Sequence, residues 1–272
     1  MSRWLIALDI DGTTVHDDGF LSPNVHREVQ RVRDLGHEVV IATGRSAANS
    51  YPVIRELDFP GKHAVASNGA VSYEYDQAGF QVVEVESFDP SPVLTRLIDV
   101  IPDAHFAVED LDGTYRFHKP FPTYALGEEN FETPLEELLH HPVSRVVVLS
   151  PSHDVDEFLG LMKEIGLHSV SYSIGYTAWL DIAPDGVDKG HGLEKLRQKL
   201  EIDPGRVLCI GDGRNDIEMF QWANELGGHS FAMGQAPSEV KRAASAITAS
   251  VEQDGVAEVL ASFEGLEFLR AD

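Results

Sequence analysis

The chain has 272 residues, and its 45 acidic and 21 basic side chains give a formal net charge of −24. This excess of acids argues against nucleic acid and anionic membranes as partners, because both are bound mainly through Lys and Arg. The single cysteine, Cys209, excludes an intramolecular disulfide framework and a cysteine-based zinc site, and we expect a buried core thiol there.

The N-terminal apolar run is interrupted early by Asp9 and Asp11, too soon for a signal peptide. No run approaches the roughly 18 apolar residues of a membrane span, so we expect a soluble cytoplasmic protein.

The first third of the chain alternates strand-like and helix-like segments. Short apolar runs are typical of strands buried on both faces, and Ser22-Pro23 is a typical helix start. The predicted elements are a strand over 4–8, a helix over 22–35, a strand over 39–42, a helix over 47–57 and a strand over 64–66. Such alternation predicts a mostly parallel sheet with helices on both faces.

The pattern changes near residue 71, where 71–75 and 80–85 flank a turn and predict an antiparallel hairpin. A less regular stretch follows, with helices over 91–101, about 132–140 and 154–165, and strands within 104–118 and over 145–149, 168–174 and 178–183. Alternation resumes with a helix over 190–200, a strand over 206–210, a helix over 215–226 and a strand near 229–233. We therefore predict an α/β fold in which 1–87 and 184–272 form a Rossmann-like core and 88–183 an inserted α+β domain.

Two acids follow the first predicted strand, in Asp9-Ile-Asp11-Gly12-Thr13-Thr14. Side chains alternate along a strand, so Asp9 and Asp11 should share one side, where open α/β sheets bind their ligands. Two such acids repel each other unless a cation or a shared proton intervenes. A calcium-binding EF-hand loop is excluded, because its twelfth position is Phe20 rather than Glu. A polar turn with capping acids is the alternative.

Three more polar segments lie beside predicted strands or helix starts: Thr43-Gly44-Arg45, Asp188-Lys189-Gly190 and Gly211-Asp212-Gly213-Arg214-Asn215-Asp216. The segment Thr43-Gly44-Arg45 offers a hydroxyl and loop amides at the start of a helix, an arrangement that commonly binds phosphate. Taken singly, the first is at least as well explained by a plain turn, and Lys189 by a solvated turn lysine. Together they would gather at one sheet edge.

Asp9, Asp11, Asp212 and Asp216 would contribute four negative charges to this site, and Lys189 one positive charge. A phosphate would be repelled unless a cation joined them. An oxygen-only ligand set with no cysteine or spaced histidines suits Mg²⁺ better than zinc.

The combination Asp9-x-Asp11-Gly12-Thr13, Thr43-Gly44-Arg45, Lys189-Gly190 and Gly211-Asp212-Gly213-x-Asn215-Asp216 resembles the four motifs of haloacid-dehalogenase (HAD) superfamily phosphatases. Further segments match the Cof-like branch, which carries a C2-type (IIB) cap: Asn68-Gly69-Ala70, Gly186-Val187-Asp188-Lys189-Gly190, Ala232-Met233-Gly234 and Asp254-Gly255-Val256-Ala257. The resemblance covers both core segments, whereas 88–183 matches only by position and element order.

The resemblance implies a role for each matching residue. Asp9 would be the nucleophile that forms an aspartyl-phosphate, and Asp11 the general acid and then the base. Thr43, Gly44, Lys189 and Asn215 would bind the phosphoryl group. The metal ligands would be Asp9, Asp11 through its main-chain carbonyl, and Asp212, with Asp216 behind them orienting water or Lys189.

The implied function is a Mg²⁺-dependent phosphatase of small phosphorylated metabolites such as sugar phosphates, with 88–183 as a lid. The alternatives are a dedicated sugar-phosphate phosphatase, a phosphomutase-like enzyme of the same fold, and a non-catalytic metabolite-binding module. The candidate substrate contacts in the insert are Tyr115, Arg116, His118, Lys119, Tyr124, Tyr172, Tyr176 and Trp179. Each is more simply a structural or surface residue, and the sequence carries no signal for an oligomeric state.

Overall fold

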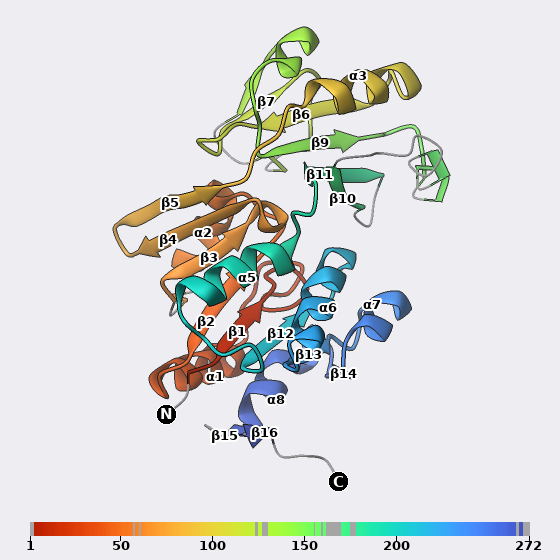
Figure 1. Cartoon of the computed structure of the whole chain (residues 1–272). Coiled ribbons are helices and arrows are strands. Elements are labelled where there is room, and N and C mark those ends of the chain that lie inside the picture. Colours follow the sequence, from red (N-terminus) through yellow and green to blue (C-terminus); the bar gives the residue numbers. More distant parts are fainter. Residues whose placement is uncertain are drawn as a thin grey trace.

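The computed structural model contains two large sheets, one above the other in Figure 1. It describes residues 3–56, 58–59, 61–122, 125–126, 130–154, 156–158, 160–161, 170–174, 178–264 and 267–268. The larger sheet is built from both ends of the sequence and the smaller one from its middle, which we call the insert (residues 88–183).

The core sheet has eight strands in the order β14-β13-β12-β1-β2-β3-β4-β5. Neighbours from β14 to β3 pair in parallel, and β4 and β5 add an antiparallel hairpin. The strands are β1 (Leu5–Leu8), β2 (Glu38–Ala42), β3 (His63–Ala66), β4 (Val71–Asp76), β5 (Gly79–Val85), β12 (Val207–Gly211), β13 (His229–Ala232) and β14 (Ala246–Ile247). This confirms the predicted α/β class and its mostly parallel sheet.

Helices cover both faces of the core sheet because its strands are apolar on both sides. Along β1, Ile6 and Leu8 join one core cluster, whereas Leu5 and Ala7 join the other. The first cluster contains α1 (Pro23–Asp34), α2 (Ala47–Glu56) and α8 (Gly255–Ala261). The second contains α5 (Lys189–Lys199), α6 (Ile217–Glu225) and α7 (Ser238–Ala243). Cys209 is fully buried in the second cluster, as predicted.

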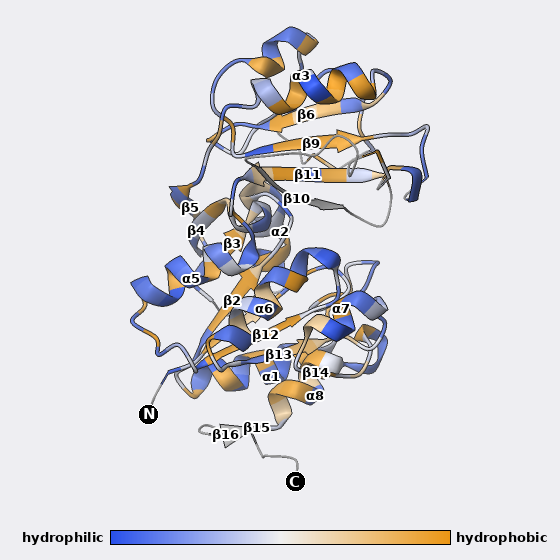
Figure 2. Ribbon diagram, turned by 45° about the vertical axis from the view of Figure 1, so that its right-hand side comes forward, coloured by the Kyte–Doolittle hydropathy of each residue, from blue (hydrophilic) through white to orange (hydrophobic). Residues whose placement is uncertain are grey.

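The insert forms a mixed six-stranded sheet in the order β10-β11-β9-β6-β7-β8. Its elements are α3 (Ser91–Val100), β6 (His105–Glu109), β7 (Tyr115–Phe117), β8 (Asn130–Glu132), β9 (Arg145–Leu149), β10 (Val170–Ile174) and β11 (Trp179–Pro184). The alternate residues Phe106, Val146 and Leu180 pack on the α3 side. The central strands are strongly hydrophobic (Figure 2).

The helix predicted over about 132–140 is wrong in length and type. The structure has only the short 3₁₀ helix η2 (Leu135–Leu139) there, and the first predicted residue, Glu132, ends β8. Pro134 separates the two, and a proline disfavours helical backbone in the residue before it. Half of the helix predicted over 154–165 lies outside the described residues, and within it the described residues 156–158 and 160–161 are helical.

The helix predicted over 215–226 is the 3₁₀ helix η3 (Arg214–Asp216) continued by α6. The sequence analysis did not predict α7, α8, the 3₁₀ helices η1 (Ser67–Gly69) and η4 (Val251–Gln253), or the small hairpin of β15 (Phe263–Glu264) and β16 (Glu267–Phe268). Among the helices in the described part of the chain, none has the length and hydrophobicity that crossing a membrane would require.

Candidate active site

A buried lysine joins the loops after β1 and β12. Lys189 is the first residue of α5, and the side chain of Asp188 caps that helix by accepting from the His191 amide at 2.8 Å. Lys189 Nζ donates to Asp9 Oδ1 at 2.7 Å and to Asp216 Oδ1 at 2.6 Å. All three side chains are buried, so a charged triad lies beneath the carboxyl edge of the sheet.

Asp216 fixes the shape of the loop after β12. Its Oδ2 accepts from the amides of Asp212 and Gly213, each at 2.9 Å, while its other oxygen accepts from Lys189. Thr13 Oγ1 donates to Asp212 Oδ1 at 2.9 Å and so ties this loop to the one after β1. Asp216 therefore positions its neighbours, and Asp212 is held beside the first loop.

Three buried carboxylates lie close enough to hold a metal ion. One oxygen each from Asp9, Asp212 and Asp216 lies within 4.8 Å of the others, among the described residues. Burial raises the pKa of Asp9 well above its ordinary value; Lys189 opposes this shift, and Asp216 and Asp212 add to it. One lysine against three acids leaves the cluster negative, so a hard divalent cation with oxygen ligands fits it.

Lys189 remains a cation in this setting. Burial alone would lower the pKa of Lys189, but Asp216 and Asp9 outweigh that effect and raise it above its usual range.

Asp11 faces the same cavity as Asp9 but has a different partner. Its carboxylate accepts from Arg45 Nε at 2.8 Å and from Arg45 Nη2 at 2.5 Å. Asp11 is exposed whereas Asp9 is buried, so the two acids that the sequence places on one side have different surroundings. The assignment of the Asp11 main-chain carbonyl to a metal stays a prediction.

The predicted phosphate-binding residues gather around the same cavity, whose volume is about 950 Å³. Thr43, Gly44 and Asn215 line it together with Asp9 and Asp11. Lys189 does not itself line the cavity but is bonded to Asp9, which does. The structure thus brings the predicted residues together, and their roles stay predictions.

The insert contributes a buried arginine that the sequence analysis missed. Arg145 donates through Nε to Glu109 Oε2 at 2.9 Å, and its Nη groups bond the Tyr115 hydroxyl and the main-chain carbonyl of Gly44. Its Nη1 also lies 3.5 Å from Asp181 Oδ1. Arg145 therefore connects the insert to the predicted phosphate-binding loop.

A second contact between insert and core lies beside the first. Ser67 Oγ donates to the two oxygens of Glu109 at 2.8 and 2.9 Å, and Asn68 Nδ2 lies 3.5 Å from Asp181 Oδ2. Ser67 and Asn68 both have left-handed backbone, with φ of 50° and 51°. The unusual turn directs both side chains to the insert.

Charged residues in apolar strands were the available signal for this network. Glu109 ends the run Phe-Ala-Val-Glu and Arg145 begins Arg-Val-Val-Val-Leu, so both were placed in strands that are otherwise hydrophobic. A charge is seldom fully buried without a partner, and the two residues face each other in the β6–β9 register.

Of the insert residues singled out from the sequence, Tyr115 and Trp179 line the cavity. Arg116 instead pairs with Asp110, with both contacts at 2.7 Å, and Lys119 donates to main-chain carbonyls over 102–104. His118 bonds the main chain of Phe106. Tyr124, Tyr176 and the side chain of Tyr172 lie outside the described residues.

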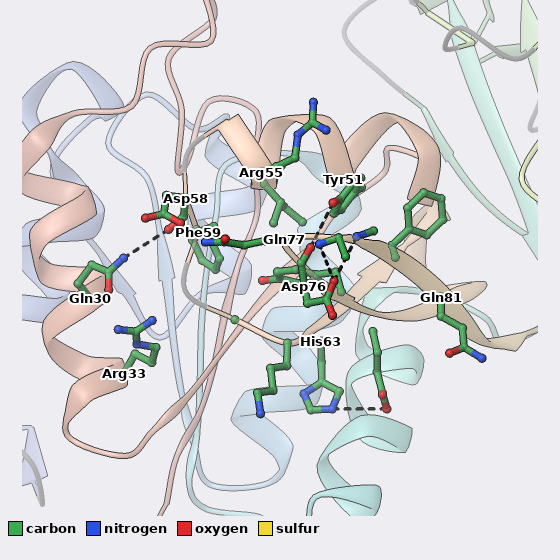
Figure 3. A pocket seen from close by; sticks show the side chains of 18 residues that line it. Gln30, Arg33, Tyr51, Arg55, Asp58, Phe59, His63, Asp76, Gln77 and Gln81 are labelled. Atoms are coloured by element: carbon green, nitrogen blue, oxygen red, sulfur yellow. Dashed lines mark hydrogen bonds and ion pairs between the residues drawn. The ribbon is translucent and has the colours of Figure 1, made fainter.

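A second cavity, of about 1090 Å³, lies beside α2 and the β4–β5 hairpin (Figure 3). Several of its polar groups are bonded to one another: Gln30 to the carbonyl of Asp58 at 3.3 Å, and Tyr51 to the carbonyl of Asp76 at 3.1 Å. Asp9 and the acids around it do not line it. The candidate active site is therefore the 950 Å³ cavity, which Asp9, Asp11 and Asp212 line.

Comparison with known proteins identifies the family of the chain. A sequence model of the haloacid dehalogenase-like hydrolases matches residues 6–260. The chain is 28% identical over 279 residues to the 5-amino-6-(5-phospho-D-ribitylamino)uracil phosphatase YitU of Bacillus subtilis, covering 97% of this chain and 98% of the relative. It is 27% identical over 255 residues to a phosphoglycolate phosphatase of Natronomonas pharaonis, covering 94% and 95%.

A similar solved structure is that of the sugar phosphatase BT4131, of HAD subclass IIB. It superposes with a TM-score of 0.82 at 20% sequence identity, covering 97% of this chain and all of that one. This likeness shows that the fold, including a second sheet in the middle of the chain, is shared. The resemblance inferred from the motifs is confirmed.

Proposed function

The chain belongs to the haloacid dehalogenase-like hydrolases and is a phosphatase of that family, and we propose that it hydrolyses phosphomonoesters of small hydroxylated metabolites through Asp9. The observation that carries this proposal is the buried Asp9 carboxylate at the floor of the cavity, bonded to Lys189. A carboxylate nucleophile divides the hydrolysis into two easier transfers.

In the first step Asp9 attacks phosphorus, the bond to the leaving oxygen breaks, and an aspartyl-phosphate forms. Lys189, on the same carboxylate, offsets the negative charge that the phosphoryl group brings. Thr43 and Asn215, at the cavity wall, would bind the phosphoryl oxygens.

Asp11 would donate a proton to the leaving oxygen and then accept one from the water that releases phosphate. In this structure its carboxylate is bonded to Arg45, so it must leave that partner, or share it, when substrate enters. Arg45 thereby keeps Asp11 at the cavity rim before the reaction.

Asp9 and Asp212 would hold Mg²⁺, together with the main-chain carbonyl of Asp11. The bound ion would supply positive charge to a cluster that has one lysine for three acids. Asp216 already accepts from Lys189 and two amides, which favours a positioning role for it.

We assign the insert, residues 88–183, the role of a cap on the core of 1–87 and 184–272. Its β7, β9 and β11 supply Tyr115, Arg145 and Trp179 to a cavity whose other wall comes from the core. A cap placed there excludes water and contacts the leaving group.

The test is a phosphomonoester panel assayed with Mg²⁺ and again with a chelator. It includes sugar and polyol phosphates, flavin mononucleotide, pyridoxal phosphate and the ribitylaminouracil phosphate of the Bacillus relative. We expect hydrolysis that needs the metal and is lost in Asp9→Asn. A requirement for a bisphosphate primer would indicate a phosphomutase instead, and no hydrolysis of any ester would overturn the proposal.

A further inference from the structure

Asp181 is the acid that the insert presents to the cavity, among the described residues. It lies on β11, on the sheet face opposite α3, where its neighbour Trp179 also faces the cavity. Trp179 Nε1 donates to Asp181 Oδ1 at 3.2 Å. The side chain of Asp181 is 17% exposed, so a ligand in the cavity can reach this carboxylate.

The residues that contact Asp181 also contact the residues proposed to bind the phosphoryl group. Asn68 lies 3.5 Å from Asp181 Oδ2 and accepts from Asn215 Nδ2 at 2.9 Å. Arg145, 3.5 Å from Asp181 Oδ1, bonds the carbonyl of Gly44. A leaving group that extends from the phosphoryl group toward the insert therefore meets Asp181.

Arg145 does not cancel the negative charge on this wall. Its guanidinium is shared between Glu109, at 2.9 Å, and Asp181, at 3.5 Å, so two carboxylates face one buried cation. The closer contact is to Glu109, which is fully buried and also bonded by Ser67. Asp181 is held by the longer contacts, which leaves its oxygens able to accept further hydrogen bonds.

We propose that Asp181 selects the leaving group: it accepts hydrogen bonds from hydroxyl groups and repels a leaving group that carries a negative charge of its own. The preferred substrates are then phosphomonoesters of uncharged polyols and sugars, and phosphorylated acids are poor substrates. Trp179 offers a flat apolar surface to the carbon chain or ring of the same group. The inference rests on the proposed function.

The test compares two substrates that differ at one end only, glucitol 6-phosphate and 6-phosphogluconate, whose terminal groups are a hydroxymethyl and a carboxylate. We expect wild-type kcat/KM to be at least about tenfold higher for the polyol. In Asp181→Asn, which keeps the shape and removes the charge, this ratio should fall by about tenfold, with a gain for the acid and a loss for the polyol.

Asp110→Asn is the matched control, since it removes one acid from the insert at a residue that pairs with Arg116 and does not line the cavity. Its substrate ratio should equal that of the wild type. Equal wild-type rates for the two substrates, or a ratio unchanged in Asp181→Asn, would overturn the inference. The comparison of the two substrates in the wild type stands even if Asp181→Asn fails to fold. A wild-type protein that hydrolyses neither these two substrates nor any other phosphomonoester would refute the proposed function instead.

Discussion

Gly12 shows how a single residue without a side chain shapes the site. Its φ is +71°, a left-handed backbone that glycine adopts at little cost. A Cβ at this position would lie 2.6 Å from Asp212 Oδ2. Gly19, in the same connection, has a φ of +83° and no atom within 4 Å of such a Cβ. Both glycines therefore have a left-handed backbone, but only at Gly12 would a Cβ collide with Asp212.

Gly12→Ala should therefore displace Asp212 as well as strain the turn. We expect it to lower the apparent affinity for Mg²⁺ by about 10- to 100-fold, as other changes that reorient a metal ligand do. Both Gly12→Ala and Gly19→Ala should lower the free energy of unfolding by about 1 kcal/mol. Activity measured against Mg²⁺ concentration separates the effects, and an equal Mg²⁺ requirement in the two variants would contradict the account.

At this scale the sequence predicts one half of the site and not the other. Asp9, Lys189, Asp212 and Asp216 stand in motifs at the ends of strands, and the parallel sheet brings them together. Arg145, by contrast, stands in no such motif: its charge in an apolar strand is a signal of a buried pair, but it does not indicate the contact with Gly44.

At the scale of elements, α5 and α6 are joined through one carboxylate. Glu194 of α5 accepts from Arg197 on its own helix at 2.8 Å and from Trp222 Nε1 of α6 at 3.0 Å. The helices are close here, since a Cβ on Gly190 would lie 2.9 Å from the Cβ of Trp222. Trp222, to which the sequence alone assigned no role, thus holds α6 against α5, the helix that begins with Lys189.

Glu194 gives a pH-dependent contribution to stability. The bond from Arg197 lowers the pKa of Glu194 from 4.5 to about 2. Because the folded-state pKa lies below the unfolded value, this contribution is complete above pH 4.5 and is lost as the pH falls toward 2. Glu194→Gln should lower the free energy of unfolding by about 1 kcal/mol at neutral pH.

Urea unfolding of wild type and Glu194→Gln across this pH range measures the difference, which should shrink as the acid end is approached. Glu225→Gln, an exposed change on α6, removes the same charge and should leave stability nearly unchanged. A Glu194 effect that is independent of pH would contradict the assignment.

Most elements of the core follow from apolar runs separated by Ser, Pro and Gly, as with α1, where Ser22 caps the helix. The helix predicted over 132–140 failed because acidic and leucine-rich composition favours helix while Pro134 interrupts it. α7 and α8 are only six and seven residues long, too short for a clear helical period.

At the scale of the whole molecule, two kinds of charge must be distinguished. The net charge of −24 is spread over the chain, whereas Asp9, Asp212 and Asp216 concentrate three acids around one lysine.

Contacts between residues far apart in the sequence join insert and core, such as Ser67 with Glu109, 42 residues apart, and Gly44 with Arg145, 101 residues apart. Such pairings depend on how two sheets meet, so the sequence did not predict them.

Mg²⁺ should stabilise the folded protein, because the acids proposed to bind it come together only on folding. At about 100 times the dissociation constant we expect a gain of about 2.7 kcal/mol, seen as a rise in Tm at constant ionic strength. Asp212→Asn should lose most of this rise, whereas Asp110→Asn should keep it. An equal rise in all three proteins would indicate general screening of the negative charge.

The central claim is that Asp9 carries the phosphoryl group during turnover. The most direct measurement is an acid quench during turnover, followed by borohydride reduction and mass spectrometry of the digested protein. We expect a phosphoryl group before reduction, and homoserine after it, on the peptide that contains Asp9, with neither in Asp9→Asn. A phosphoryl group on another residue, or wild-type turnover by Asp9→Asn, would contradict the account.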